Sequence, residues 1–155
     1  MISPESLRRY PFFGGLTQSQ LASIAMIATQ ETYPAGVTLF QKGLSADTLY
    51  FLEEGSIDLY YPAQGKNPSS SPDGILVSEV NPGEPFSISA LIEPYVLTST
   101  ARAAKTSRVI QIEAKSLRAL FKADKRMGYL LTQQATKAAI ERLDATRVQL
   151  AAAWA

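Results

Sequence analysis

Short apolar runs that alternate with turn residues are the feature of this sequence that most restricts its fold. They fill residues 33–61, where each run spans only a few residues before the next turn. We expect strands at 37–40, 49–53, 56–61, 75–80 and 109–112, with turns at 33–36, 42–47 and 54–55. Strands this short, with turns this regular, are typical of an antiparallel β-sandwich or barrel.

Two short helices are expected before the first strand. Ser3 can cap a helix that begins at Pro4, because Ser is a favoured N-cap and Pro is tolerated at the first helical position. Residues 17–20 read Thr-Gln-Ser-Gln, which fits a capping box. The helix after it carries an apolar stripe at Leu21, Ile24, Ala25, Ile27 and Ala28. We therefore assign residues 1–30 to N-terminal helices.

From Ala114 the pattern is helical to the end of the sequence. A short helix is predicted over 116–121, and Asp124 can cap a long helix that continues through Trp154 without a proline. The first half of that helix has an apolar stripe at Met127, Leu130, Leu131, Ala135, Ala138 and Ala139. At a rise of 1.5 Å per residue the helix is about 45 Å long, which is more than a body of this size can cover.

The far half of the long helix therefore needs a second surface to cover it. Its apolar residues fall near 3.5-residue spacing, interrupted by Arg147, and are Ile140, Leu143, Leu150 and Trp154. This spacing predicts a homodimer interface with a second copy of the chain. The alternative is that the helix folds back and buries the same residues as ordinary core.

The sequence contains no cysteine and no histidine. This excludes disulfides, thiolate chemistry, zinc sites of the usual kind and histidine acid–base catalysis, so we expect neither metal-binding nor catalytic residues. The 15 basic and 14 acidic residues nearly cancel, and no overall field attracts nucleic acid or a membrane surface. No apolar run is long enough for a signal peptide or a transmembrane span, which favours a soluble, cytoplasmic protein.

Two stretches of the strand-rich region differ from the rest. Residues 62–73 read PAQGKNPSSSPD and lack apolar periodicity, so we predict a solvated loop, with a phosphoacceptor or partner-binding role left open. Residues 83–104 read GEPFSISALIEPYVLTSTARAA. This second stretch gives a Gly-Glu-Pro turn, a short Ser-Ile-Ser-Ala-Leu segment, a loop at 93–95 and a return to strand. It is the candidate site for a small molecule.

Three motifs connect this order of elements to a known family. Residues 33–43 read YPAGVTLFQKG, residues 49–57 read LYFLEEGSI, and FFGGL at 12–16 is followed by Leu21. Together they resemble the cyclic nucleotide-binding domain, the sensory half of catabolite-activator-type (Crp/Fnr) regulators. The resemblance covers nearly all 155 residues. It implies a mainly β fold, an antiparallel jelly roll with short N-terminal helices and a long C-terminal helix.

We accordingly treat residues 1–155 as a single domain of this type. Its expected parts are N-terminal helices at 1–30, the jelly roll at 33–113 with the cassette at 83–104, and C-terminal helices at 114–155.

The resemblance makes 83–104 the family's phosphate-binding cassette, in which a glutamate binds the ribose and an arginine binds the cyclic phosphate. On this alignment Ile88 occupies the glutamate position, Ser87 the cassette glycine, Thr98 the arginine position and Ser99 the family's Ser/Thr. Ile88 cannot accept a hydrogen bond from a ribose hydroxyl, and Thr98 brings no positive charge to a phosphate. We therefore expect a degenerate cassette that is not a standard cAMP or cGMP site.

Other groups in the cassette can still attract an anion. They are the backbone N–H groups of Ser89, Ala90 and Leu91 at a helix start, and Arg102, which shares a strand face with Thr98 if no bulge intervenes. The predicted ligand-binding residues are Ser87, Ile88, Ser89, Ala90, Leu91, Thr98, Ser99 and Arg102. The expected ligand is a cyclic nucleotide or another small anionic molecule, and no other cofactor is assigned.

Three functions are compatible with these residues. The first is a regulatory or sensory domain whose pocket occupancy repositions the long helix. The second is a ligand-free dimerisation or scaffold module, with a cAMP or cGMP binder that uses non-standard contacts as a further alternative. The third is a cupin-type enzyme, which the absence of histidine disfavours because its usual metal site cannot be built.

Direct DNA binding is not expected. The sequence ends at Ala155 directly after the long helix, without the helix-turn-helix of a catabolite activator. A modest basic cluster is interpreted as a solvated face, and its members are Lys115, Arg118, Lys122, Lys125 and Arg126. Any control of transcription would then act through a regulatory protein partner.

Overall fold

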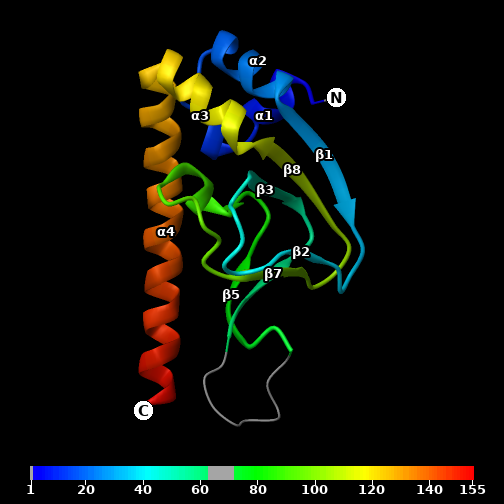
Figure 1. Cartoon of the computed structure of the whole chain (residues 1–155), viewed down its shortest axis with the longest axis vertical. Coiled ribbons are helices and arrows are strands. Elements are labelled where there is room, and N and C mark those ends of the chain that lie inside the picture. Colours follow the sequence, from blue (N-terminus) through cyan, green and yellow to red (C-terminus); the bar gives the residue numbers. More distant parts are fainter. Residues whose placement is uncertain (1, 63–71) are drawn as a thin grey trace.

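Two facing antiparallel β-sheets form the body of the protein (Figure 1). The computed structural model describes residues 2–62 and 72–155, and within them each sheet has four strands. The strand order is β1-β8-β3-β6 in one sheet and β2-β7-β4-β5 in the other. This is the antiparallel jelly roll with flanking helices that the sequence predicted, so the fold class is confirmed.

The strands lie close to their predicted positions. They are β1 (Ala28–Tyr33), β2 (Thr38–Phe40), β3 (Thr48–Glu54), β4 (Ile57–Tyr61), β5 (Ile75–Val80), β6 (Pro85–Phe86), β7 (Thr100–Ala103) and β8 (Ser107–Glu113). The sequence analysis missed β6, whose two residues are too few to show any alternation, and also β1, whose first residues it assigned to the N-terminal helices. The loop predicted over 62–73 falls mostly on residues 63–71, which lie outside the described residues.

Helices gather at one end of the jelly roll (Figure 1). They are α1 (Pro4–Arg8), the 3-10 turn η1 (Pro11–Phe13), α2 (Gln18–Met26) and α3 (Ala114–Ala123). Both predicted N-caps are confirmed: Ser3 Oγ accepts from the Ser6 N–H at 3.2 Å, and Thr17 and Gln20 form a complete capping box.

The prediction that the second helix includes Ile27 and Ala28 is wrong. Helix α2 ends at Met26, and Ala28 is the first residue of β1, which pairs with β8 from Ala28 opposite Ile112 onward. The two apolar residues fit the helical stripe in sequence. Pairing with a strand more than 80 residues away overrides that local preference.

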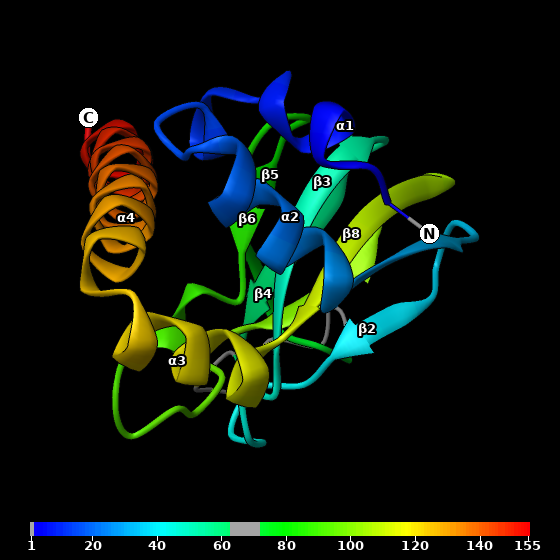
Figure 2. The ribbon, with the colours of Figure 1, turned by 90° about the horizontal axis from the view of Figure 1, so that it is seen from above.

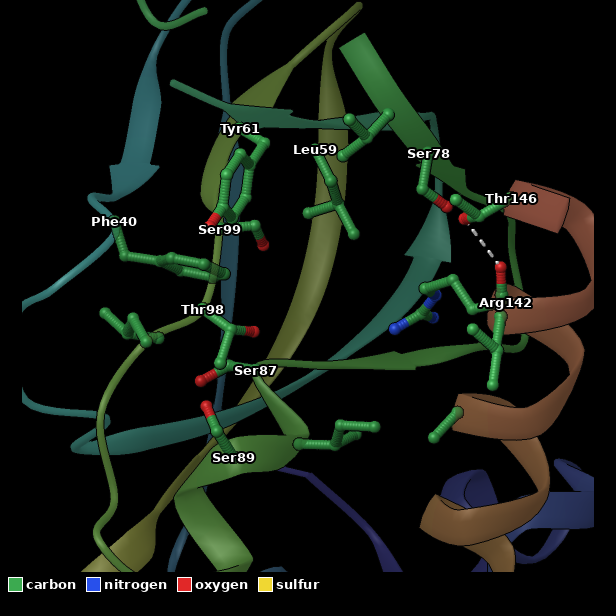
Figure 3. Close-up of a pocket in the computed structure, with 15 residues that line it drawn as sticks. Phe40, Leu59, Tyr61, Ser78, Ser87, Ser89, Thr98, Ser99, Arg142 and Thr146 are labelled. Carbon is green, nitrogen blue, oxygen red and sulfur yellow. Dashed lines mark hydrogen bonds between the residues drawn. The ribbon is translucent and has the colours of Figure 1, made fainter. Parts of the chain in front are cut away.

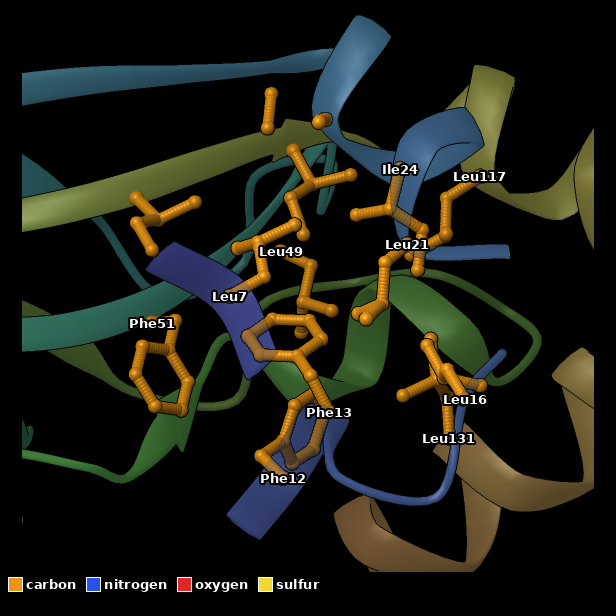
Figure 4. Close-up of a cluster of buried hydrophobic side chains, with 14 of the residues drawn as sticks. Leu7, Phe12, Phe13, Leu16, Leu21, Ile24, Leu49, Phe51, Leu117 and Leu131 are labelled. Carbon is orange, nitrogen blue, oxygen red and sulfur yellow. The ribbon is translucent and has the colours of Figure 1, made fainter. Parts of the chain in front are cut away.

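Strand β3 is buried on both of its faces. Leu49 and Phe51 face a core cluster under the N-terminal helices, while Tyr50 and Leu52 face the core between the two sheets. The first cluster also contains Phe12 and Phe13 from η1 and apolar residues from α2, α3 and the long C-terminal helix (Figure 4). The two cores therefore share one strand, which ties the helical layer to the jelly roll.

The long helix α4 (Lys125–Ala153) runs along one side of the jelly roll (Figures 1 and 2). Asp124 caps it as predicted, with Oδ1 accepting from the Met127 N–H at 3.1 Å. Gly128 lies in its first turns, where an added Cβ would be 3.0 Å from Phe121 Cβ of α3. Glycine at this position thus permits close packing of the two helices.

Only the first half of α4 is buried against the body, through Met127, Leu131 and Ala135. The apolar residues of its far half are exposed: Ile140 by 61%, Leu143 by 48%, Leu150 by 60% and Trp154 by 84%. The alternative that this half folds back as ordinary core is therefore wrong. No helix among the described residues is long and apolar enough to span a membrane.

The turn between β3 and β4 requires glycine for two reasons. Gly55 has a positive φ of 104°, which costs other residues about 1–2 kcal/mol. In addition, an added Cβ would lie 2.7 Å from the Ser107 Cα, where the backbone of a neighbouring strand has no room to move.

We therefore predict that Gly55→Ala lowers the free energy of unfolding more than Gly36→Ala does. Gly36 is the matched control, because its φ is 88° and nothing lies within 4 Å of an added Cβ. The difference should be about 1–3 kcal/mol, the usual cost of overpacking. Chemical denaturation of both variants measures it, and equal losses would contradict this account of the turn.

Candidate functional site

The cassette over residues 83–104 includes β6 and makes one tight turn directly after it. Ser87 adopts the left-handed conformation (φ 58°, ψ 39°), and the short 3-10 turn η2 (Ile88–Leu91) follows it. The chain then passes through a cis peptide bond between Glu93 and Pro94 and a positive φ at Tyr95 before it reaches β7. The Ser-Ile-Ser-Ala-Leu segment is therefore a single helical turn.

Arg118 of α3 holds this cassette in place. Its Nε donates to the Ala90 carbonyl at 2.9 Å, an NH2 group donates to the Ala46 carbonyl at 3.4 Å, and its guanidinium carbon lies 3.8 Å from the centre of the Tyr95 ring. The interpretation of Arg118 as part of a solvated basic face is wrong. The other four members of that cluster are exposed.

A cavity of about 280 Å³ lies between the cassette, the strands and α4 (Figure 3). Its wall is largely apolar, with Phe40 of β2, Leu59 of β4 and Leu97 of the cassette among the lining residues. The polar groups on the wall are the hydroxyls of Tyr61, Ser78, Ser87, Ser89, Thr98, Ser99 and Thr146, and the guanidinium of Arg142. Such a wall suits a small molecule that is apolar over most of its surface.

The structure brings most of the predicted ligand-binding residues to this cavity. The residues that line it are Ser87, Ile88, Ser89, Thr98 and Ser99. Leu91 lines an adjoining cavity of similar volume that shares Ile88 and Thr98 with the first. Ala90 is fully buried beneath η2, and its N–H already donates to the Ser87 carbonyl at 3.0 Å. The Ala90 N–H is therefore not available to an anion.

Arg102 does not line either cavity, and the suggestion that it replaces the cassette arginine is wrong on geometry. Its guanidinium lies 3.4 Å from the Asp73 carboxylate and 6.0 Å from the centre of the Tyr60 ring. The sequence argument required Thr98 and Arg102 to share a face of one strand. Strand β7 begins only at Thr100, so the two-residue alternation does not extend back to Thr98.

Arg142 of α4 is the residue that the sequence analysis missed. Among the lining residues that the structure describes, it alone carries a charge. Its position in the sequence could have indicated this role. Leu131, Ala135 and Ala139 form a stripe at four-residue spacing on one face of the helix, and Arg142 continues the stripe three residues later. An arginine on the inward face of a long helix is a candidate site residue by that criterion.

The guanidinium of Arg142 is partly shielded from solvent. Its guanidinium donates to the Pro85 carbonyl of β6 at 2.7 Å. Burial lowers the pKa of the Arg142 guanidinium from its ordinary value, while the negative charges of Glu84 and Glu141 act in the opposite direction. Arginine remains protonated under such conditions, so Arg142 presents a positive charge to the cavity.

Ser87 is under local strain at the cavity wall. Residues other than glycine rarely adopt a positive φ, and its Oγ is buried with no hydrogen-bond partner among the described residues. An unsatisfied buried hydroxyl costs about 1–3 kcal/mol. Strain of this kind is often retained where a ligand is bound. No group of residues in the described part of the chain could hold a metal ion.

The sequence profile of the family described as "Cyclic nucleotide-binding domain" matches residues 30–124, more than half of the chain. Together with the fold and the placement of the cassette, this match shows that the chain belongs to the cyclic nucleotide-binding domain family, of the type found in Crp/Fnr regulators. No curated protein sequence matches the chain.

Solved structures extend the comparison. A protein from Geobacter metallireducens GS-15, provisionally named a cyclic nucleotide-binding protein, is 38% identical, with a TM-score of 0.80 over 92% of this chain and 99% of its own. The N-terminal domain of a transcriptional regulator from Streptomyces coelicolor A3(2) is 26% identical, with a TM-score of 0.64 over 90% of this chain and 93% of its own.

A third solved structure is similar in fold alone. The regulatory domain of Toxoplasma gondii PKA, crystallised with cAMP, is 21% identical, with a TM-score of 0.70 over 87% of this chain and 49% of its own.

We predict that Ser87→Gly stabilises the protein. Glycine removes the left-handed strain of about 1–2 kcal/mol and the unsatisfied hydroxyl, against an entropic cost of about 0.5–1 kcal/mol. Thermal or chemical denaturation should show a gain of about 1 kcal/mol.

Ser89→Gly is the control for this comparison, since Ser89 lies within η2 and has no positive φ. It should lower stability. A loss of stability in Ser87→Gly would mean that the Ser87 hydroxyl already has a hydrogen-bond partner, which would contradict this account.

Proposed function

We propose that this chain is a regulatory, ligand-sensing domain whose ligand occupies the cavity between the cassette and α4. The observation that carries the proposal is the composition of the cavity wall, because α4 contributes Ala139, Arg142, Leu143 and Thr146. A molecule in the cavity touches the long helix directly. Occupancy can then change the position or the stability of the helix, which is the part of the chain most available to a partner.

The ligand of this proposal is not bound as cAMP or cGMP is bound by a standard cassette. Ile88 packs against the core under the N-terminal helices and lines the cavity with hydrocarbon, and Thr98 offers a hydroxyl in place of a guanidinium. The T. gondii domain was crystallised with cAMP, but its similarity to this chain concerns the fold. Fold similarity does not transfer a ligand.

We predict that millimolar cAMP or cGMP leaves the melting temperature of the protein unchanged, whereas a physiological ligand raises it. A ligand at 100 times its dissociation constant adds about 2.7 kcal/mol of stability. Thermal melts with both cyclic nucleotides, a panel of other nucleotides and small organic acids provide the measurement. The T. gondii regulatory domain serves as a positive control for cAMP.

Two outcomes would change the assignment. A clear shift with cAMP or cGMP would favour a cyclic nucleotide binder with non-standard contacts. No shift with any compound would favour the ligand-free scaffold.

We further propose that the protein is a homodimer through the far half of α4. The residues Ile140, Leu143, Leu150 and Trp154 lie along one side of the helix and are about half or more exposed in the described part of the chain, with Leu143 also at the edge of the cavity. In this proposal the domain acts in the cytoplasm, is not an enzyme, does not bind DNA itself and signals to a protein partner.

We predict that Ile140→Glu combined with Leu150→Glu converts the dimer to a monomer, because each substitution places a charge in an apolar interface. Leu143 is left unchanged because it also lines the cavity. The control is Ala145→Glu with Gln149→Glu, two exposed positions that lie about 100° or more around the helix axis from Ile140 and Leu150. Light scattering measures the mass. The control should remain a dimer, and a dimer that persists in the first variant would place the interface elsewhere.

A further inference from the structure

The guanidinium of Arg142 is an incompletely neutralised cation at the cavity wall. The hydrogen bond to Pro85 uses one of its five N–H groups. No carboxylate among the described residues lies within ion-pair distance of it, and Glu84 and Glu141 influence it only from farther away. A partly buried charge without a close counter-ion is costly, and a bound anion would offset that cost.

Three neutral hydroxyls of the same cavity lie on the cassette, across from α4. Figure 3 shows the hydroxyls of Ser87, Ser89 and Thr98 gathered on the cassette side, while the Arg142 side chain enters from α4. Apolar side chains line much of the rest of the wall, Phe40, Leu59 and Ile88 among them. The cavity therefore has a positive group at the helix, three hydroxyls at the cassette and apolar side chains on much of the rest of its wall.

We propose that Arg142 is the anion receptor of this cavity, and that the ligand is a small organic molecule with a single negative charge. Its carboxylate group binds the guanidinium at α4, its apolar body fills the space between, and a neutral polar end meets the cassette hydroxyls. This inference rests on the proposed function and names the class of ligand. One guanidinium and no second cation on the described wall match one negative charge.

The family resemblance implies that the cassette binds the negatively charged group of the ligand, and this proposal assigns that group to α4. The charge is bound by the long helix and not by the cassette. The incoming anion binds the N–H groups that the Pro85 carbonyl leaves free, so binding adds a contact between α4 and the ligand beside the existing contact between α4 and β6. The helix is thus the first element to sense occupancy.

The test uses pairs of probes that differ only in charge. Benzoate with benzamide, and indole-3-acetate with indole-3-acetamide, each compare a carboxylate with its neutral amide on the same apolar body. Binding of all four to the full chain is measured by calorimetry for the wild type, Arg142→Gln and Arg126→Gln. Arg126 is the matched control, an exposed arginine in the first turn of the same helix.

We expect the wild type to bind at least one carboxylate more tightly than its amide. Arg142→Gln should weaken that carboxylate about tenfold or more, since a charge-assisted hydrogen bond is lost, and Arg126→Gln should leave its affinity unchanged. The NMR signal of the Arg142 Nε–H in the wild type gives a readout that needs no variant. It should move on addition of the carboxylate and not of the amide.

The contrary outcomes separate this inference from the proposed function. If a probe binds but Arg142→Gln retains wild-type affinity, or if the amides bind as tightly as the acids, Arg142 is not the receptor and the sensing function stands. If no probe and no nucleotide binds the wild type, the sensing function and this inference are both overturned.

Discussion

The pairing of β3 with β8 is the interaction on which the rest of the structure depends. Four consecutive apolar residues, from Leu49 to Leu52, point alternately to the two faces of β3, and both faces are buried. Strand β8 does the same, with Val109 in one core and Ile110 in the other. A single strand pair thus anchors the helical layer on one side and the second sheet on the other. Neither core would be complete without it.

The candidate site is built outward from that pair. Phe86 of β6 stacks on Tyr50 of β3 at a ring separation of 5.0 Å, which fixes the entry to the cassette. Arg118 fixes the end of η2 from α3, and Arg142 reaches β6 from α4. The cassette is therefore held by three elements that are distant in sequence. Two of these supports are arginines that donate to backbone carbonyls.

Much of the fold was accessible from local sequence patterns. The turn at Gly55, the capping box at Thr17 and the N-cap at Asp124 each depend on residues within a few positions of one another, and the structure has all three. Strand β1 was not predicted because its partner lies in β8, and a local stripe does not reveal such a pairing. The positions of Ser87, Ile88, Thr98 and Ser99 at one cavity followed from the family resemblance.

By itself, the sequence determined most of the order of elements and the family, since these are matters of residue identity and short-range spacing. Only the tertiary structure decided which charged side chain reaches the cavity. Arg102 is near Thr98 in sequence yet lies outside the site, whereas Arg142 is more than 40 residues away and lines it. The reason is physical: a side chain's surroundings depend on how α4 packs across β6 and the cassette, which no local pattern specifies.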